Sequence, residues 1–339
     1  QDPARWRFGA DPAYEQDPPT RHFGFGQGVM EYYDAFDALP MALQFLQNAA
    51  DGQAPSGMIA QVTALDGGSF HPDYCLWWIV ALEETARFAG TWEVVRPFVP
   101  ETMRILATVA DWRDEDGLAR EVPGVMFLEH LDHGREGACA PFAAIHRLAL
   151  GSAARMAEAL GYPYEAQLWR AQAEAIRDAF HPRFYDEGRG LYADCHAHGR
   201  RQGPHSELGQ ALAVLARLHP GDGRALLARA VNAPGVLQAQ FYSGAFVLDA
   251  LARAGLHEIG CRLIRERWGP MLGDGQGTLW EERQIYVQDR GDGIPKPFLR
   301  SRCHPWAGSP LSWLNRHVLG LRVEEVGGPL VIAPNPARL

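Results

Sequence analysis

Residues 139–180 read CAPFAAIHRLALGSAARMAEALGYPYEAQLWRAQAEAIRDAF, and they set the pattern for the whole chain. Gly161 is a stop signal for a helix over 139–160, and Pro163 begins a second helix over 163–180, which ends at His181-Pro182. The two helices are therefore joined by a tight turn. The first has apolar side chains at helical spacing, namely Phe142, Ile145, Ala149, Ala153 and Met156.

The same periodicity recurs along most of the chain. It predicts further helices over 28–38, 40–49, 74–90, 92–113, 206–218, 223–231, 241–254, 257–268 and 308–319. Tight connections such as Gly255-Leu256 alternate with long loops at 50–72, 116–138, 186–205 and 270–307. This alternation predicts an all-α array of helical hairpins that closes into a barrel. The long loops would gather on one face, where loops on a rigid scaffold usually carry function.

No segment divides the helical region, so we expect one domain over residues 1–322. Residues 323–339 look extended, and we interpret them as a tail or as the start of a C-terminal β module. The chain has 339 residues, so it is long enough to bury a sizeable core.

The bulk composition excludes several classes of partner. Net charge is −9 without a basic run, which argues against nucleic acid and anionic membranes. No apolar run approaches the ~20 residues of a membrane span. No signal peptide is visible, which favours the cytoplasm. The five cysteines are scattered and look like small buried hydrophobes. The run Asp194-Cys195-His196-Ala197-His198 lacks further ligands at metal-binding spacing, so we expect neither a metal nor a cofactor.

Two short runs near the end contain the candidate site residues. Residues 277–282 read GTLWEE, and residues 301–310 read SRCHPWAGSP. An indole can cover the apolar face of a sugar, while a neighbouring carboxylate orients or deprotonates a water. The alternative is that the tryptophans belong to the core and the acids to the surface. For the two runs together we favour a sugar site.

These runs resemble two signatures, Thr-Thr-x-Trp-Glu and Ser-x-x-His-x-Trp-Ser, of the catalytic helical domain of bacterial α-L-rhamnosidase-type glycoside hydrolases. Weaker likeness extends over roughly residues 12–335, in segments 73–78, 190–194 and 330–334. The resemblance implies a six-hairpin (α/α)6 barrel flanked by β-sandwich modules. It also implies an inverting exo-hydrolase that releases terminal α-L-rhamnose or a related sugar.

The resemblance assigns roles to the late runs. Glu281 is the base that activates water, with the neighbouring Glu282 as its rival. His304 binds a sugar hydroxyl, and Trp280 and Trp306 either wall the pocket or buttress it from behind. Inversion also needs a second carboxyl group, which protonates the leaving oxygen.

The general acid is the least clear of these assignments. Glu15 lies nearest to the family's acidic run, but Phe25-Gly26-Gln27-Gly28 stands where Gly-Asp is expected. The acid-rich loop at 127–133 offers alternatives. Glu129 takes the place of an aspartate in a family Asp-Trp pair that contacts the sugar, and His130 replaces the tryptophan. Glu129 and the nearby Asp132 would bind hydroxyls or serve as the acid instead.

Trp77 and Trp78 are adjacent on a predicted helix and so point in different directions. We expect one in the core and the other, taken as Trp78, at the pocket. Two other functions stay open. A polysaccharide lyase would use Tyr192, His196 or His198, although no basic cluster for a uronate is evident. A non-catalytic glycan-binding module would need no second carboxyl group.

Overall fold

The computed structural model describes residues 39–60, 70–273, 277–283, 286–288, 296–298 and 304–337. The helix predicted at 28–38 lies outside these residues. The other predicted helices all fall on described residues. Each of them corresponds to observed helical structure, with the changes of extent reported below.

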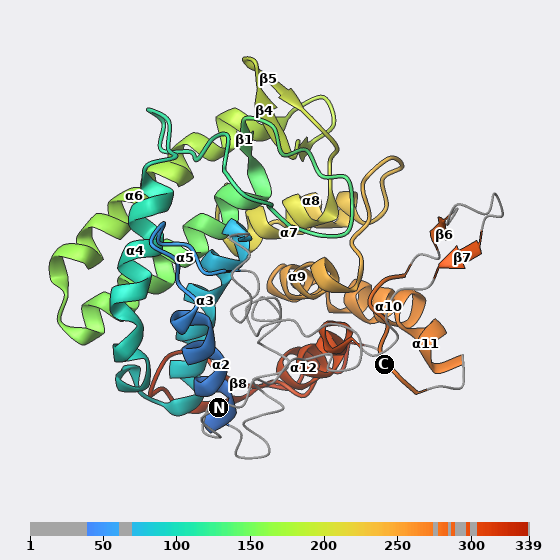
Figure 1. The fold of residues 1–339 in the computed structure, drawn as a ribbon. Coiled ribbons are helices and arrows are strands. Elements are labelled where there is room, and N and C mark those ends of the chain that lie inside the picture. Colours follow the sequence, from blue (N-terminus) through green and yellow to red (C-terminus); the bar gives the residue numbers. More distant parts are fainter. Residues whose placement is uncertain are drawn as a thin grey trace.

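Among the described residues, five helices form the inner layer, and outer helices lie between them in the sequence. α7 (Glu207–Leu215) shows why they lie inside, because eight of its nine residues are buried and no polar face remains for water. Figure 1 shows these helices following one another round the molecule. They are α3 (Pro72–Ala89), α5 (Ala140–Leu160), α7, α9 (Phe241–Arg253) and α12 (Ser309–Trp313).

The remaining helices pack outside this layer, each burying one face. The α5–α6 pair is the hairpin predicted from the opening stretch, and Gly161 caps α5 in the left-handed region at φ 86°. This confirms the tight turn at Gly161. The outer elements are α2 (Leu39–Asp51), η3 (Trp92–Phe98), α4 (Val99–Ala110), α6 (Pro163–Phe184), α8 (Arg224–Ala230), α10 (His257–Arg267) and α11 (Gly269–Gly273).

Three helix predictions were wrong in detail. The segment 92–113 is not continuous, because a 3-10 turn, η3, precedes α4, and prolines 97 and 100 flank the join. α6 does not end at His181-Pro182 but runs on to Phe184, with Pro182 inside its last turn. The segment 308–319 divides into η4 (Pro305–Gly308), α12 and a π-helical turn, η5 (Leu314–Val318).

The long loop predicted at 186–205 contains short strands. β2 (Tyr185–Asp186) pairs with β3 (Leu191–Tyr192). A second sheet has the order β1 (Ala138–Cys139), β4 (Cys195–Ala197) and β5 (Arg200–Gln202). His198 and Gly199 join β4 to β5, both with positive φ, as a two-residue type I′ hairpin requires. Strands of two or three residues are too short to show a period-2 pattern, so the sequence did not reveal them.

Two further hairpins lie late in the chain. β6 (Tyr286–Gln288) pairs with β7 (Lys296–Phe298), and β8 (Leu321–Val323) pairs with β9 (Leu330–Ile332). The extended tail that was predicted from residue 323 is thus a hairpin that begins two residues earlier.

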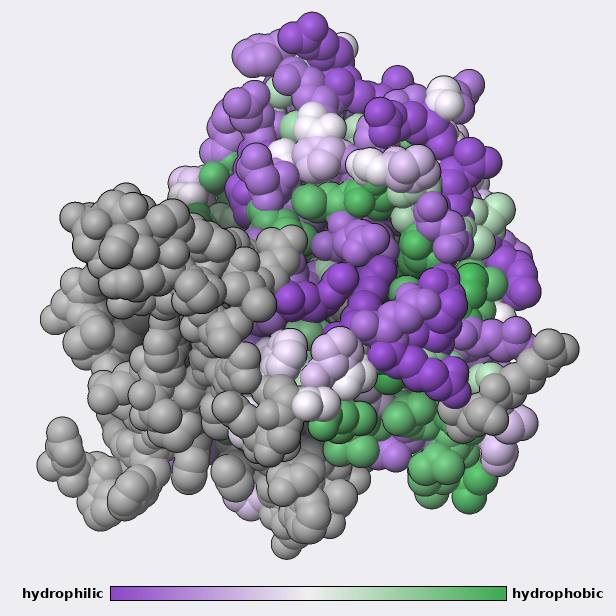
Figure 2. All heavy atoms as spheres, turned by 90° about the vertical axis from the view of Figure 1, so that its right-hand side faces the viewer, coloured by the Kyte–Doolittle hydropathy of each residue, from purple (hydrophilic) through white to green (hydrophobic). Residues whose placement is uncertain are grey.

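Figure 2 shows one face of the molecule, where hydrophilic side chains cover much of the upper half and apolar ones lie between and below them.

One continuous apolar cluster joins the inner helices to the faces of the outer ones. Cys75, Cys139, Cys195 and Cys261 are buried and free, as predicted, while Cys303 lies outside the described residues. Trp77 and Trp78 are both buried in this cluster. Among the helices described, none combines the length and the apolar character needed to cross a bilayer.

His146 on α5 gives the fold a predictable sensitivity to acid. The side chain is fully buried, and burial lowers its pKa to about 3, with a smaller contribution from Arg113. The unfolded chain binds a proton near pH 6.5 while the folded chain does not, so stability falls as pH drops below that value. Between pH 7 and pH 5 this one group should cost about 2 kcal/mol of unfolding free energy.

His146→Leu removes this linkage, so the variant should lose about 2 kcal/mol less than the parent between pH 7 and pH 5. Urea unfolding at the two pH values measures the difference. His198→Gln is the control, because His198 is exposed on the β4–β5 turn and should follow the parent. Equal losses in the parent and in the His146 variant would contradict the prediction.

Candidate active site

The structure brings the two late runs together. His304 N donates to Leu279 O at 3.0 Å, and Trp306 Nε1 donates to the main-chain oxygen of Glu281 at 2.8 Å. The rings of His304 and Trp306 lie 4.1 Å apart between centroids. Glu281, Glu282, His304 and Trp306 are all buried. Trp280 is partly buried and packs against the core.

The segment 277–283 is held by the two residues that directly precede α9. The guanidinium of Arg283 donates to Ala239 O at 2.9 Å, and its main-chain N–H donates to Gln240 Oε1 at 2.9 Å. Trp268 Nε1 donates to Ala307 O at 2.8 Å and supports the second run. The carboxyl group of Glu281 therefore sits on a segment whose main chain is fixed at several points.

His130 links this pair of runs to the loop at 124–135. Its Nε2 lies 3.1 Å from Glu281 Oε1, and its Nδ1 lies 3.4 Å from Glu282 Oε1. The ring packs edge-on against Phe127, with centroids 4.7 Å apart, and lies 5.6 Å from Trp306. The sequence singled out Glu281 and Glu282, but it did not predict that His130 stands between them.

Asp73 at the start of α3 fixes the middle of this loop. Its two carboxylate oxygens accept from Phe127 N at 3.1 Å and from Leu128 N at 3.0 Å. Burial raises the pKa of Asp73, and the two main-chain donors oppose that shift. Leu128 has a φ of 52°, which is costly for a residue with a side chain. The clamp from Asp73 stabilises this conformation and so directs the next residue, Glu129, inward.

Glu129 is buried, and both of its oxygens accept hydrogen bonds within the chain. Oε2 accepts from Ser243 N at 2.9 Å and Ser243 Oγ at 2.7 Å, while Oε1 accepts from His130 N at 2.9 Å. Ser243 lies in the first turn of α9, where the helix dipole favours a negative charge. The structure thus uses the carboxylate of Glu129 to anchor the loop and to orient His130.

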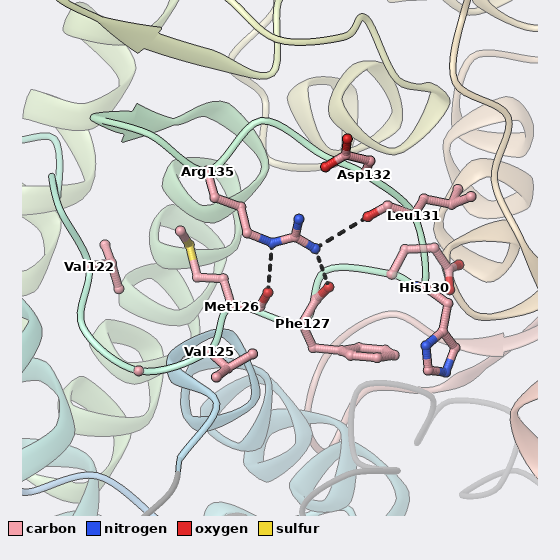
Figure 3. A pocket seen from close by; sticks show the side chains of 10 residues that line it. Val122, Val125, Met126, Phe127, His130, Leu131, Asp132 and Arg135 are labelled. Atoms are coloured by element: carbon pink, nitrogen blue, oxygen red, sulfur yellow. Dashed lines mark hydrogen bonds between the residues drawn. The ribbon is translucent and has the colours of Figure 1, made fainter. Parts of the chain in front are cut away.

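A pocket of about 700 Å³ opens beside this loop. Figure 3 shows Arg135 crossing it, with its guanidinium bound to the loop's own main chain. Its donors reach the carbonyl oxygens of Met126, Phe127, Leu131 and His133 at 2.9–3.4 Å. Asp132 and His130 also line the pocket, and Asp132 is exposed.

The end of this loop at His133 contacts the run 194–198, which the sequence analysis considered as a metal site. His133 Nδ1 lies 2.8 Å from Asp194 Oδ2, and Asp194 Oδ1 accepts from Ser206 N and Oγ. Asp194 and His133 are both buried, so this aspartate serves to anchor the loop.

The described residues contain one group with the donors and spacing to hold a cation. One ligand atom from each of His130, Glu281 and Glu282 lies within 4.8 Å of the others. A histidine and two carboxylates suit a divalent transition metal in donor type. The two ring nitrogens, however, face different carboxylates, whereas a bound ion would take only one of them. The expectation that the site uses no metal stays a prediction.

Two predicted site residues lie away from this assembly or outside it. Trp78 is fully buried, donates from Nε1 to Leu46 O at 3.3 Å and packs edge-on against Phe98, so its position gives no support to a sugar contact. Its neighbour Trp77 stacks on Phe246. Glu15 lies outside the described residues.

Comparison with known proteins places the chain in a family. The family model of the bacterial α-L-rhamnosidase six-hairpin glycosidase domain matches residues 27–318. The chain therefore belongs to this family, and its fold is the (α/α)6 barrel that was predicted, with short C-terminal strands. No curated protein matches the chain.

Solved structures support the fold. A family 78 rhamnosidase of Bacillus sp. GL1 is 24% identical with a TM-score of 0.77, and the match covers 87% of this chain and 31% of that one. A Klebsiella oxytoca rhamnosidase with rhamnose bound is 21% identical with a TM-score of 0.73, covering 87% and 57%. A Streptomyces avermitilis α-L-rhamnosidase complexed with L-rhamnose is 23% identical with a TM-score of 0.65, covering 86% and 28%. The chain spans only part of each.

Proposed function

We propose that this domain hydrolyses glycosides with inversion and releases a terminal α-L-rhamnose or a related sugar. One observation carries the proposal. The two sequence runs that hold the site's acids, histidine and tryptophans contact each other through Trp306 Nε1 and the main-chain oxygen of Glu281, whose side chain is buried. Membership of the rhamnosidase domain family supports the reaction class.

Glu281 is the base in this proposal and removes a proton from the attacking water. An inverting pair needs a second carboxyl group about 6.5–9.5 Å away, which leaves room for that water. Glu282 does not meet this condition, because oxygens of the two carboxyl groups lie within 4.8 Å of each other. Glu129 is committed to Ser243 and to His130 N. We therefore keep Glu15 as the proposed acid and Asp132, which lines the pocket, as its alternative.

The remaining residues bind the sugar. His304 hydrogen-bonds a hydroxyl, and Trp306 or Trp280 presents an indole to the apolar face of the ring. The pocket beside the loop at 124–135, which His130 connects to Glu281, has a volume in the range that suits small-molecule ligands. Rhamnose is the first-choice sugar because the late signatures and the family both point to it. Flanking β-sandwich modules are part of the same proposal.

The polysaccharide lyase alternative gains no support from Tyr192 or His198, two of the three residues that would carry it. The hydroxyl of Tyr192 lies between His181 Nδ1 and His219 Nδ1, at 2.8 and 3.0 Å. Burial raises the pKa of Tyr192, which is unfavourable for a tyrosine base. His198 lies on the exposed turn between β4 and β5.

A panel of 4-nitrophenyl glycosides tests the proposal, with NMR on the substrate that reacts fastest. We expect the α-L-rhamnoside to react fastest and β-L-rhamnose to appear before mutarotation mixes the anomers. Release of the α-anomer first would refute inversion. Products that absorb as unsaturated uronides from an acidic polysaccharide would indicate a lyase. Sugar binding without hydrolysis of any glycoside would indicate a binding module.

A further inference from the structure

Among the described residues, His130 touches both the pocket and the two late-run acids. It lines the pocket beside Phe127 and Asp132, and its side chain is 13% exposed. From there its Nε2 reaches Glu281 Oε1 at 3.1 Å, across 151 residues of sequence. Glu281 is the more buried residue of the two acids that the late run provides.

The orientation of the His130 ring is fixed on several sides. Phe127 meets it edge-on, at 88° between ring planes, and Trp306 lies 5.6 Å away on another side. Its main-chain N–H is held by Glu129, whose other oxygen is anchored to Ser243 at the start of α9. The ring therefore contacts Glu281 from a rigid support, not as a free side chain.

The two ring nitrogens make different contacts. The contact from Nε2 to Glu281 has hydrogen-bond geometry, and an ionised carboxylate only accepts, so Nε2 carries the proton and donates. The contact from Nδ1 to Glu282 is longer, at 3.4 Å, and is an ion pair only when Nδ1 also carries a proton. Glu281, Glu282 and Glu129 are the charged groups that face His130 from these elements, and Arg135 shares its pocket.

We propose that His130 is a positioning residue: its Nε2–H holds the carboxylate of Glu281 in the orientation in which it activates water. This inference deepens the proposed function and rests on it. A carboxylate that is free to rotate would leave the fold intact but would present its lone pairs to the water only part of the time. The effect should therefore fall on kcat and leave KM nearly unchanged.

Two substitutions separate the two nitrogens. The amide nitrogen of His130→Gln can occupy the place of Nε2, whereas the amide of His130→Asn reaches only the place of Nδ1. With 4-nitrophenyl α-L-rhamnoside we expect His130→Gln to keep kcat within about tenfold of the parent, and His130→Asn to lose about 10²-fold. KM should change less than about threefold in both. His130→Phe, which keeps the ring packing but has no donor, should behave like the Asn variant.

Equal kcat values in the Gln and Asn variants, whether both high or both low, would overturn the inference. Thermal unfolding of each variant checks that the fold is intact. Crystal structures of the Gln and Asn variants supply a readout that does not depend on turnover. The Glu281 carboxylate should keep its orientation in the Gln variant and leave it in the Asn variant, and an unmoved carboxylate in both would also overturn the inference. A parent protein that hydrolyses no glycoside would refute the proposed function, and the crystal structures of the variants would then still test whether His130 orients Glu281.

Discussion

Arg267→Met should destabilise the domain by about 3–5 kcal/mol, because it leaves a buried carboxylate without its cation. Arg267 in the last turn of α10 binds Glu207 in the first turn of α7 through two hydrogen bonds, both 2.7 Å long. The side chains are 6% and 1% exposed. With arginine removed, Glu207 retains the hydrogen bond from Ala239 N at 2.9 Å but has no positive partner in this contact.

Urea unfolding at pH 7 measures this loss. The double variant Arg267→Met/Glu207→Gln should recover more than half of it, since the neutral amide still accepts from Ala239 and carries no buried charge. Arg262→Met is the surface control. Its pair with Glu266 is exposed, so its removal should cost less than about 1 kcal/mol. An Arg267 variant as stable as this control would show that the buried pair contributes nothing.

This ion pair also bears on the site. Glu207 holds Ala239 N, while the Ala239 carbonyl and the Gln240 side chain hold Arg283, two residues beyond Glu281. The two inner-layer helices α7 and α9 are thereby connected to the segment that carries the proposed base. The outer helix α10 contributes Arg267 to this support although none of its described residues lines the pocket.

The fold was largely predictable because its signals are local. Gly161 and Pro163 mark a hairpin within four residues, and helical periodicity repeats inside each helix. The short strands were not predicted because two or three residues are too few to show the period-2 pattern of a strand. The late runs were predictable as a pair because each combines tryptophan with an acid or a histidine in a short segment. In the structure the two runs meet where Trp306 contacts Glu281, and their role as a sugar site stays a prediction.

The site's supports were not predictable for a physical reason. Asp73 reaches Leu128 across 55 residues, and His130 reaches Glu281 across 151. Such contacts form only when the barrel closes. A local sequence pattern therefore cannot predict which loop will contact which helix. The same closure explains Glu129, which the sequence places in an acid-rich loop but which is buried against the start of α9. The general acid proposed at Glu15 lies beyond the described residues and stays a prediction.

The largest effect on activity is expected from Glu281→Gln. The amide has the same shape as the carboxyl group and can still accept from His130 Nε2, and the main-chain oxygen still accepts from Trp306. The fold should therefore persist. The amide cannot take a proton from water, so kcat should fall by at least about 10³-fold, within the range that general-base removal produces.

Glu282→Gln is the matched control. The residue is adjacent and buried, and its carboxyl group also faces His130, but the proposal gives it no proton transfer. We expect its kcat to stay within about tenfold of the parent, because it alters only the electrostatic surroundings of the base. A greater loss in the Glu282 variant than in the Glu281 variant would assign the base to Glu282 instead.

The most direct measurement pairs turnover with sugar binding in one preparation of Glu281→Gln. Calorimetric titration with L-rhamnose gives the affinity, and the nitrophenyl assay gives kcat. We predict rhamnose affinity within about threefold of the parent together with the loss of at least about 10³-fold in kcat. A variant that still hydrolyses the glycoside at more than about a tenth of the parent's rate would contradict the assignment of Glu281 as the base.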